Sequence, residues 1–237
     1  MKGHRTVRQE KRNNAGSAMV TVLVVVVFIS ILATVMLYLS GSNFQMKVTD
    51  FRTKESFYQA ETSVEELKAQ LVKDVEIAFA KAYTATVSEY SGMGDEYTRE
   101  FYFRQYFADE MNTIWEKRCG VIVPDPSNPT NRYFDWETGI GNVVESVAAD
   151  AFLDIEVTPS FGFDTSEEGK VIMRGVTVTY DSPQYYTSII STDLCITIPT
   201  VNWSGAFAAP AATPAPGISY FDGNFSSCVN YVNWIKQ

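Results

Sequence analysis

Residues 18–39 read AMVTVLVVVVFISILATVMLYL, a run of 22 residues without charge, glycine or proline. A helix rises about 1.5 Å per residue, so the run spans roughly 33 Å, close to the ~30 Å hydrocarbon core of a bilayer. A buried core helix is the alternative, but such a helix normally carries a polar stripe. Only Thr21, Ser30 and Thr34 interrupt the run, and their hydroxyls can bond to the preceding turn. The run therefore predicts one membrane-spanning helix.

The charge in front of the run predicts its orientation. Five basic residues stand against one acid, Glu10, and give the first sixteen residues a net charge of +4. The basic residues are Lys2, Arg5, Arg8, Lys11 and Arg12. By the positive-inside rule the N-terminus stays in the cytoplasm and residues after about 40 are exported. The whole chain carries −9, which leaves −13 on the rest, and an acidic exported part has no electrostatic reason to bind nucleic acid.

Small residues stand before the apolar run, at Ala15-Gly16-Ser17, and not after it. A secretory signal peptide has a shorter apolar region of ~7–15 residues, followed by a small-residue cleavage site. No such site follows the run before Gly41. Cleavage at Gly16 would therefore leave the whole hydrophobic helix on the mature chain.

The segment from Lys11 to Leu39 resembles the class III leader and N-terminal helix of type IV pilins and type II secretion pseudopilins. A later piece, Phe57-Tyr58-Gln59-Ala60-Glu61, resembles the aromatic-Ala-Glu segment of the same helix. The resemblance is strongest to the PilX-like minor pilins and the GspK-like tip pseudopilins, and it covers residues 11 to about 67. It implies that a prepilin peptidase cuts after Gly16 and methylates Ser17. It also implies that the mature helix joins other pilin or pseudopilin subunits at a pilus assembly platform.

Two positions depart from the pattern of a major pilin. Ser17 replaces the usual Phe or Met after the glycine, and Thr21 stands where the family carries Glu at the fifth mature position. In the family that carboxylate is thought to neutralise the amino terminus of a neighbouring subunit, and a buried unpaired charge is expensive. The departures therefore favour a minor subunit, including one at the tip, over a repeating shaft subunit.

Helical periodicity continues beyond the apolar run, from residue 42 to about residue 88. From Phe57 onward apolar residues recur at steps of three and four, the stripe of an amphipathic helix. The stripe consists of Phe57, Ala60, Val64, Leu67, Leu71, Val75, Ala78 and Ala82. After a break at residues 91–95, an aromatic-rich second helix is expected from Glu96 to about Lys117. We expect its aromatic residues to lie in the core; an exposed patch that binds a partner is the alternative.

The C-terminal half of the chain changes to strand patterns. Phe152–Val157, Lys170–Asp181 and Tyr186–Ile198 are the predicted strands, and the turn residues around Pro183 predict that the last two form an antiparallel hairpin. A shorter strand is expected at residues 120–123, followed by a loop at residues 124–129. The last twenty residues are expected to dock back on the head.

These patterns predict an α+β fold. A long N-terminal helix, membrane-spanning in its first half, carries a C-terminal antiparallel β-sheet head packed on its second half. The expected segments are a basic leader at 1–16, a transmembrane and filament-core helix at 17–40, a helical stem and helical part of the head at 41–118, and a β-rich head at 119–237. A Pro/Ala-rich loop lies at 207–217 within the head.

Residues suited to catalysis are scarce in the exported part. The only histidine is His4, in the leader, which removes histidine-based triads and histidine metal ligands from the head. Asp164, Glu167 and Glu168 lie in one loop that could bind Ca²⁺, but their spacing does not fit an EF-hand loop, and a solvated acidic surface is the simpler interpretation. We expect no catalytic residue, cofactor or metal ion, and therefore no enzyme.

Three cysteines occur, at Cys119, Cys195 and Cys228. An exported head permits one disulfide, and the odd count leaves one thiol over. The sequence does not fix the pairing, and we favour Cys195 with Cys228 because both fall in the C-terminal half.

The resulting hypothesis is a minor pilin-like structural subunit of a type IV pilus or a type II secretion pseudopilus. It would be a single-pass protein of the cell membrane with its head outside, and part of a cell-surface pilus after assembly. The first alternative is a membrane-anchored extracellular binding protein that does not enter a filament. The second is an anchored hydrolase that uses carboxylates, although no pair of acids is singled out by the sequence.

Overall fold

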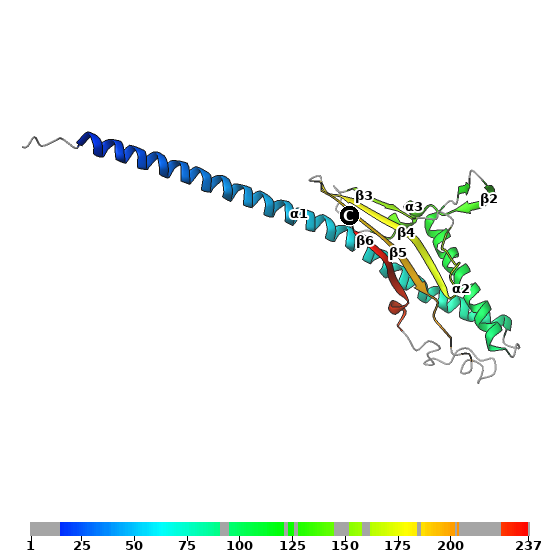
Figure 1. The fold of residues 1–237 in the computed structure, drawn as a ribbon. Helices are drawn as coiled ribbons and strands as arrows, with labels where there is room; N and C mark the ends of the chain where they lie inside the picture. Colours follow the sequence, from blue (N-terminus) through cyan, green and yellow to red (C-terminus); the bar gives the residue numbers. More distant parts are fainter. Residues whose placement is uncertain are drawn as a thin grey trace, which may run out of the picture. The chain divides into compact units, whose positions relative to one another are not determined.

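The first and longest element is α1, a helix of 76 residues from Ala15 to Tyr90. The computed structural model describes residues 15–90, 95–120, 123–125, 128–144, 152–157, 162–183, 186–201, 203 and 224–236 (Figure 1). The chain divides into two compact units, Met1–Phe51 and Arg52–Gln237. The prediction of one helix through the apolar run and onward to about residue 88 is confirmed.

The hydroxyl groups within the apolar run bond to the helix itself, as the sequence predicts. The Thr21 hydroxyl donates to the Ser17 carbonyl at 3.0 Å, and the Ser30 hydroxyl donates to the Val26 carbonyl at 2.8 Å. The Thr34 hydroxyl donates to the Ser30 carbonyl, also at 2.8 Å. The three polar side chains therefore leave no unsatisfied hydroxyl in an otherwise apolar segment.

In the second unit, α2 runs from Glu96 to Cys119 and pairs with α1 as an antiparallel helical hairpin. The Asp95 carboxylate caps its start by accepting from the Tyr97 amide at 3.1 Å. Polar contacts between the two helices follow one another in antiparallel order: Glu89 with Tyr106, Lys81 with Glu110, and Asp74 with Arg118. The predicted second helix is thus confirmed.

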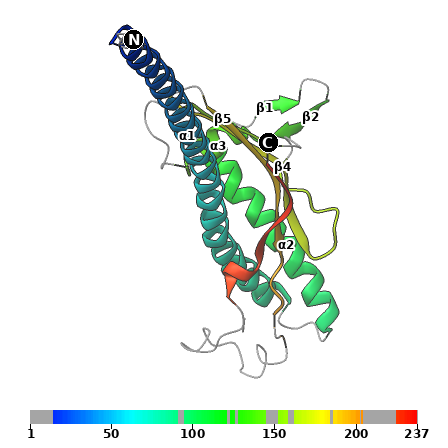
Figure 2. The ribbon, with the colours of Figure 1, turned by 60° about the vertical axis from the view of Figure 1, so that its left-hand side comes forward.

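A four-stranded antiparallel sheet forms the other layer, in the order β3-β4-β5-β6 (Figure 1). Figure 2 shows β4 and β5 of this sheet beside α2. The strands are β3 (Phe152–Glu156), β4 (Lys170–Asp181), β5 (Thr187–Thr197) and β6 (Val229–Lys236). The predicted hairpin is β4–β5, with Val178 opposite Ile190. The expected docking of the C-terminal residues is confirmed for the described residues 229–236, which form β6 and pair along β5.

The core lies between the sheet and the two helices. On α1 the predicted stripe is the buried face: every member from Ala60 to Ala82 is fully buried, and Phe57 is partly buried against the same cluster. The sheet contributes its apolar face to this cluster: Ile155, Val171, Met173, Val176, Val178, Tyr180, Ile190, Leu194, Ile196 and Val229. The α+β fold, with an antiparallel sheet packed on the second half of a long helix, is therefore confirmed.

A bulge in β4 keeps its apolar side chains on the core face. Val171 and Met173 are buried at odd positions, whereas Val176 and Val178 are buried at even positions. The register with β5 shifts between Met173 and Val176, where Gly175 has a φ of 62°. This left-handed conformation suits glycine, and one extra residue reverses which face the following side chains occupy.

A short two-stranded ribbon and a third helix were not predicted. The ribbon pairs β1 (Val123–Asp125) with β2 (Asn128–Tyr133). The strand predicted at residues 120–123 shares Val123 with β1, and its residues 121–122 lie outside the described residues. The loop predicted at residues 124–129 is wrong at both ends, because these lie in the two strands. Prolines are tolerated because a two-stranded ribbon has only edge strands. The third helix, α3, spans Trp136–Gly141. The leader residues 1–14 and the loop at 207–217 lie outside the described residues.

Candidate functional site

The apolar segment of α1 offers the largest exposed hydrophobic surface among the described residues. Its large side chains from Met19 to Leu39 are all solvent-exposed, the least exposed being Leu32 at 44%. Among the described residues only α1 is long and apolar enough to cross a membrane. A continuous surface of this kind needs a lipid or protein environment. The chain therefore has one candidate membrane-spanning helix near its N-terminus.

Gly16 and Ser17 lie in the first turn of this helix and are exposed. A Cβ added at Gly16 would meet no atom within 4 Å, so packing within the described chain gives no reason for glycine there. The predicted processing site is thus open in the structure, and its cleavage stays a prediction. The Thr21 hydroxyl is already bonded within the helix and carries no charge that could pair with a neighbouring amino terminus.

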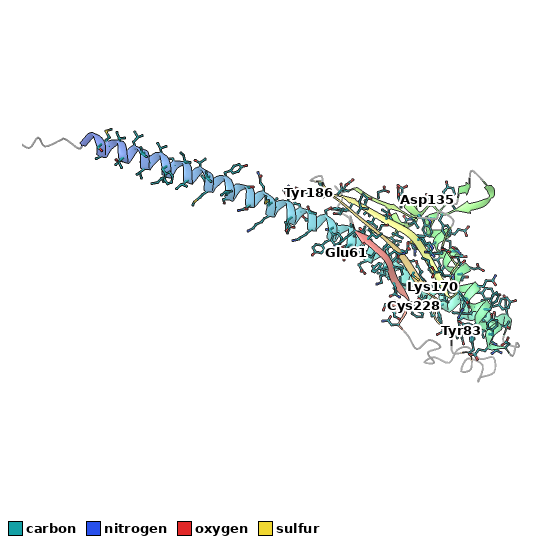
Figure 3. The ribbon with its side chains drawn as sticks, in the orientation of Figure 1. Glu61, Tyr83, Asp135, Lys170, Tyr186 and Cys228 are labelled. Carbon is teal, nitrogen blue, oxygen red and sulfur yellow. The ribbon has the colours of Figure 1, made fainter. Side chains whose placement is uncertain are left out.

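The aromatic-Ala-Glu piece at residues 57–61 lies on the part of α1 that carries the head. Ala60 is fully buried in the core, and Glu61 is half-buried. Figure 3 labels Glu61 on this part of α1. The ammonium of Lys236 in β6 lies 4.8 Å from the centre of the Phe57 ring. Packing against the sheet is thus sufficient to explain why apolar residues occur in this piece.

A second candidate site is a groove on the head, which we call the α2–β4 groove. One wall is a face of α2 on which Tyr97, Phe101, Gln105 and Asp109 follow one another at helical spacing, beside Arg104, Ala108 and Asn112. The other wall consists of Thr165, residues 167–169 before β4, Lys170 at the start of β4, and Ile198. The groove encloses about 450 Å³. Lys170 marks its β4 wall in Figure 3.

Ion pairs occupy the charged groups around this groove. Arg104 pairs with Glu100 at 3.0 Å and with Glu168 at 3.1 Å. Lys170 pairs with Glu167 at 2.8 Å, and the hydrogen bond to this lysine is the main reason that the pKa of Glu167 is lowered. These contacts fix the wall of the groove and neutralise most of its charge.

The acidic loop considered above as a Ca²⁺ site holds its carboxylates against basic residues. The Arg174 guanidinium binds Asp164, and this hydrogen bond, followed by one from Ser166, lowers the pKa of Asp164 to about 2. Glu167 and Glu168 have the partners described above. Within the described residues no three potential metal-ligating side chains gather in one place.

The most buried ion pair among the described residues was not predicted from the sequence. Asp74 on α1 is fully buried and accepts two hydrogen bonds from Arg118 on α2, at 2.5 and 2.9 Å. Gln70 also donates to it at 2.9 Å. The signal that could have revealed the pair is the position of Asp74 between Leu71 and Val75, both members of the apolar stripe.

All three cysteines are buried free thiols in the structure. Burial, followed by the charge of Asp135, raises the pKa of Cys119 to about 11; burial also raises the pKa of Cys195 and of Cys228. Cys195 lies opposite Asn230 in the β5–β6 register, two residues beyond Cys228. The bond between Cys195 and Cys228 is not formed here and stays a prediction.

No protein-family model matches the chain, and no curated protein and no solved structure shows significant similarity to it. Its function is therefore inferred from its own residues and fold.

Proposed function

We propose that the chain is a minor, pilin-like structural subunit of a type IV pilus or a type II secretion pseudopilus. It is inserted into the membrane by its N-terminal helix and contributes to filament initiation, assembly or tip function. The observation that carries the proposal is the order of features on one helix. Ala15-Gly16-Ser17 comes first, then an exposed apolar segment, and then the buried stripe under a sheet.

The order of these features along α1 also indicates which proteins the chain would interact with. A prepilin peptidase on the cytoplasmic side removes residues 1–16 and methylates Ser17. The apolar helix then leaves the lipid to pack against the helices of other pilin or pseudopilin subunits at the assembly platform. The net charge of +4 before the helix supports an N-terminus in the cytoplasm and a head outside the cell membrane.

Thr21 supports a minor position over a shaft position. A repeating subunit needs a charge partner for each buried amino terminus, because an unpaired charge in an apolar filament core is costly. The Thr21 hydroxyl donates to the Ser17 carbonyl of its own helix at 3.0 Å. It therefore offers no ionic partner to a neighbouring subunit, and this suits a subunit present in few copies.

The decisive experiment measures the mature N-terminus. The full chain is expressed with a prepilin peptidase, and the membrane and sheared-filament fractions are analysed by intact mass and N-terminal sequencing. We expect a chain that begins at methylated Ser17 and is present in the filament fraction. A chain that still begins at Met1 would refute processing as a pilin.

Two glycines provide a matched pair of variants for this experiment. Gly16 and Gly41 both lie in α1, and a Cβ at either position would meet no atom within 4 Å. We expect Gly16→Val to retain the leader and Gly41→Val to be processed normally. Equal processing of both variants would show that Gly16 does not define the cleavage site.

The alternative function is a single-pass, membrane-anchored extracellular binding protein outside any filament. The α2–β4 groove favours it, because exposed aromatic and polar side chains line a hollow of about 450 Å³ on the head. In this case the chain would keep residues 1–16 and would remain in the membrane fraction after shearing.

A further inference from the structure

The α2–β4 groove presents aromatic rings that the head itself does not cover. Tyr97 is 78% exposed and Phe101 is 56% exposed, one helical turn apart on the same wall. Four other aromatic or large apolar residues of α2, Phe103, Phe107, Met111 and Trp115, are fully buried in the core. The two exposed rings therefore lie outside the core, and they form an apolar platform at one end of a polar groove.

Polar side chains continue the same wall at the same spacing. The Gln105 amide and the Asp109 carboxylate follow Phe101 on successive turns, and both are exposed. Neither side chain makes a hydrogen bond or ion pair with any described part of the chain. Asn112, further along, uses its oxygen to accept from the Phe163 amide at 3.3 Å. The wall thus offers free donors and acceptors next to the rings.

Charge distinguishes between the ligand classes that could fill such a groove. Its two cations, Arg104 and Lys170, are already bound to Glu168 and Glu167. The remaining acid, Asp109, has no basic partner within the described residues. An anionic ligand would approach three carboxylates, Asp109, Glu167 and Glu168, whose negative charge repels it. A ligand without charge meets no such barrier.

We propose that the α2–β4 groove binds a neutral oligosaccharide. The C–H faces of its sugar rings lie on the Tyr97 and Phe101 rings, whose negative π-faces attract weakly positive hydrogen atoms. Its hydroxyls, each both donor and acceptor, bind the Gln105 amide and the Asp109 carboxylate. The groove volume of about 450 Å³ falls within the range of ~300–1,000 Å³ that small-molecule sites occupy. This inference goes beyond the proposed function and does not depend on incorporation into a filament.

An apolar segment of another protein is the competing occupant. It would cover the two rings, but its apolar side chains would offer no hydrogen bond to Gln105, Asp109 or Thr165, and each of these groups that is buried unpaired is costly. Sugar hydroxyls satisfy these side chains, and this is why the observations favour a glycan.

The test uses the full chain in phosphatidylcholine nanodiscs. Maltoside detergents are avoided because their headgroup is itself a neutral sugar. An array of neutral and acidic oligosaccharides identifies the best neutral probe, and calorimetry then measures its affinity. We expect Tyr97→Ala and Phe101→Ala each to weaken binding about tenfold, which corresponds to about 1.4 kcal/mol. A tenfold rise in salt should change the affinity by less than about twofold, because the ligand carries no charge.

Tyr58→Ala is the matched control. Like the two groove rings, Tyr58 is largely exposed, at 61%, but it lies on α1 and does not line the groove. It should leave the affinity unchanged. All three variants should unfold at the same temperature as the wild type, because none of these rings is buried. The proposal is overturned if no neutral oligosaccharide on the array binds, if the groove variants bind as tightly as the wild type, or if an acidic oligosaccharide binds more tightly than its neutral counterpart.

Discussion

The Asp74 carboxylate on α1 accepts two hydrogen bonds from the Arg118 guanidinium on α2, at 2.5 and 2.9 Å, and Asp74 is fully buried. Arg118 also lies over the Trp115 ring, with its guanidinium carbon 4.6 Å from the ring centre. This bidentate pair fixes the position of α1 and α2 relative to each other along the helix axes, because a shift of one turn would leave both charges unpaired.

Removal of one partner of this pair should destabilise the head strongly. Asp74→Ala leaves the largely buried Arg118 without a counter-charge, and we expect a loss of about 3 kcal/mol of unfolding free energy. The loss is measured by thermal unfolding of the full chain in detergent, followed by tryptophan fluorescence. The double variant Asp74→Leu with Arg118→Met removes both charges and should be much closer to the wild type. Equal destabilisation by the single and double variants would show that packing, and not the unpaired charge, causes the loss.

The ion pair between Asp164 and Arg174 predicts an acid-dependent loss of stability. The pKa of Asp164 is lowered to about 2, below the value of about 3.9 expected in the unfolded chain. Its contribution to stability is therefore complete above about pH 4 and is lost as the pH falls toward 2. Arg174→Met should move the pKa of Asp164 up toward its ordinary value, which carboxyl NMR on the labelled chain can measure. A pKa that stays near 2 in this variant would contradict the assignment of Arg174 as its main cause.

Close packing between α2 and α3 predicts a severe effect at Gly139. A Cβ at this position would lie 2.6 Å from the Cys119 sulfur and 3.6 Å from Trp115. We expect Gly139→Ala to cost about 1–3 kcal/mol through overpacking. Cys119→Ala removes the clashing sulfur, so the double variant should recover most of that loss in thermal unfolding. Additive losses in the two single variants would rule out the sulfur contact as the cause.

Asp193 on β5 forms hydrogen bonds to residues at the bulges of both neighbouring strands. Its carboxylate accepts from the Gly175 amide of β4 at 2.7 Å and from the Asn233 side chain of β6 at 2.9 Å. Asp193→Ala leaves the part-buried Gly175 amide without its partner and should cost about 1–3 kcal/mol. Asp154 on β3 is a suitable control, since its carboxylate makes no hydrogen bond with the described residues. Asp154→Ala should change stability by about 0.5 kcal/mol or less in the same assay.

Membrane orientation can be tested with thiol labelling. The three native thiols are buried with raised pKa values, so they should react slowly with a membrane-impermeant maleimide. In right-side-out vesicles from cells without a prepilin peptidase, Glu168→Cys should be labelled and Lys2→Cys should be protected. The side chain of Glu168 is 89% exposed, so the new thiol is accessible. The opposite labelling pattern would reverse the orientation inferred from charge.

The sequence by itself determined the elements whose pattern is local. The uncharged run identified the candidate membrane helix, and steps of three and four from Ala60 to Ala82 identified the buried face of α1. The strand pattern placed β3, β4 and β5 within a residue or two, because alternation of side chains is a property of each strand alone.

Only the tertiary structure decided what depends on residues far apart in the chain. Asp74 and Arg118 are 44 residues apart, and Arg104 and Glu168 are 64 residues apart. The α2–β4 groove needs a helix and a distant turn side by side, and the bulge at Gly175 became visible only against the register of β5. Side-chain periodicity records which face of an element is apolar. It does not record which other element covers that face, because pairing and register are set by packing across the whole core.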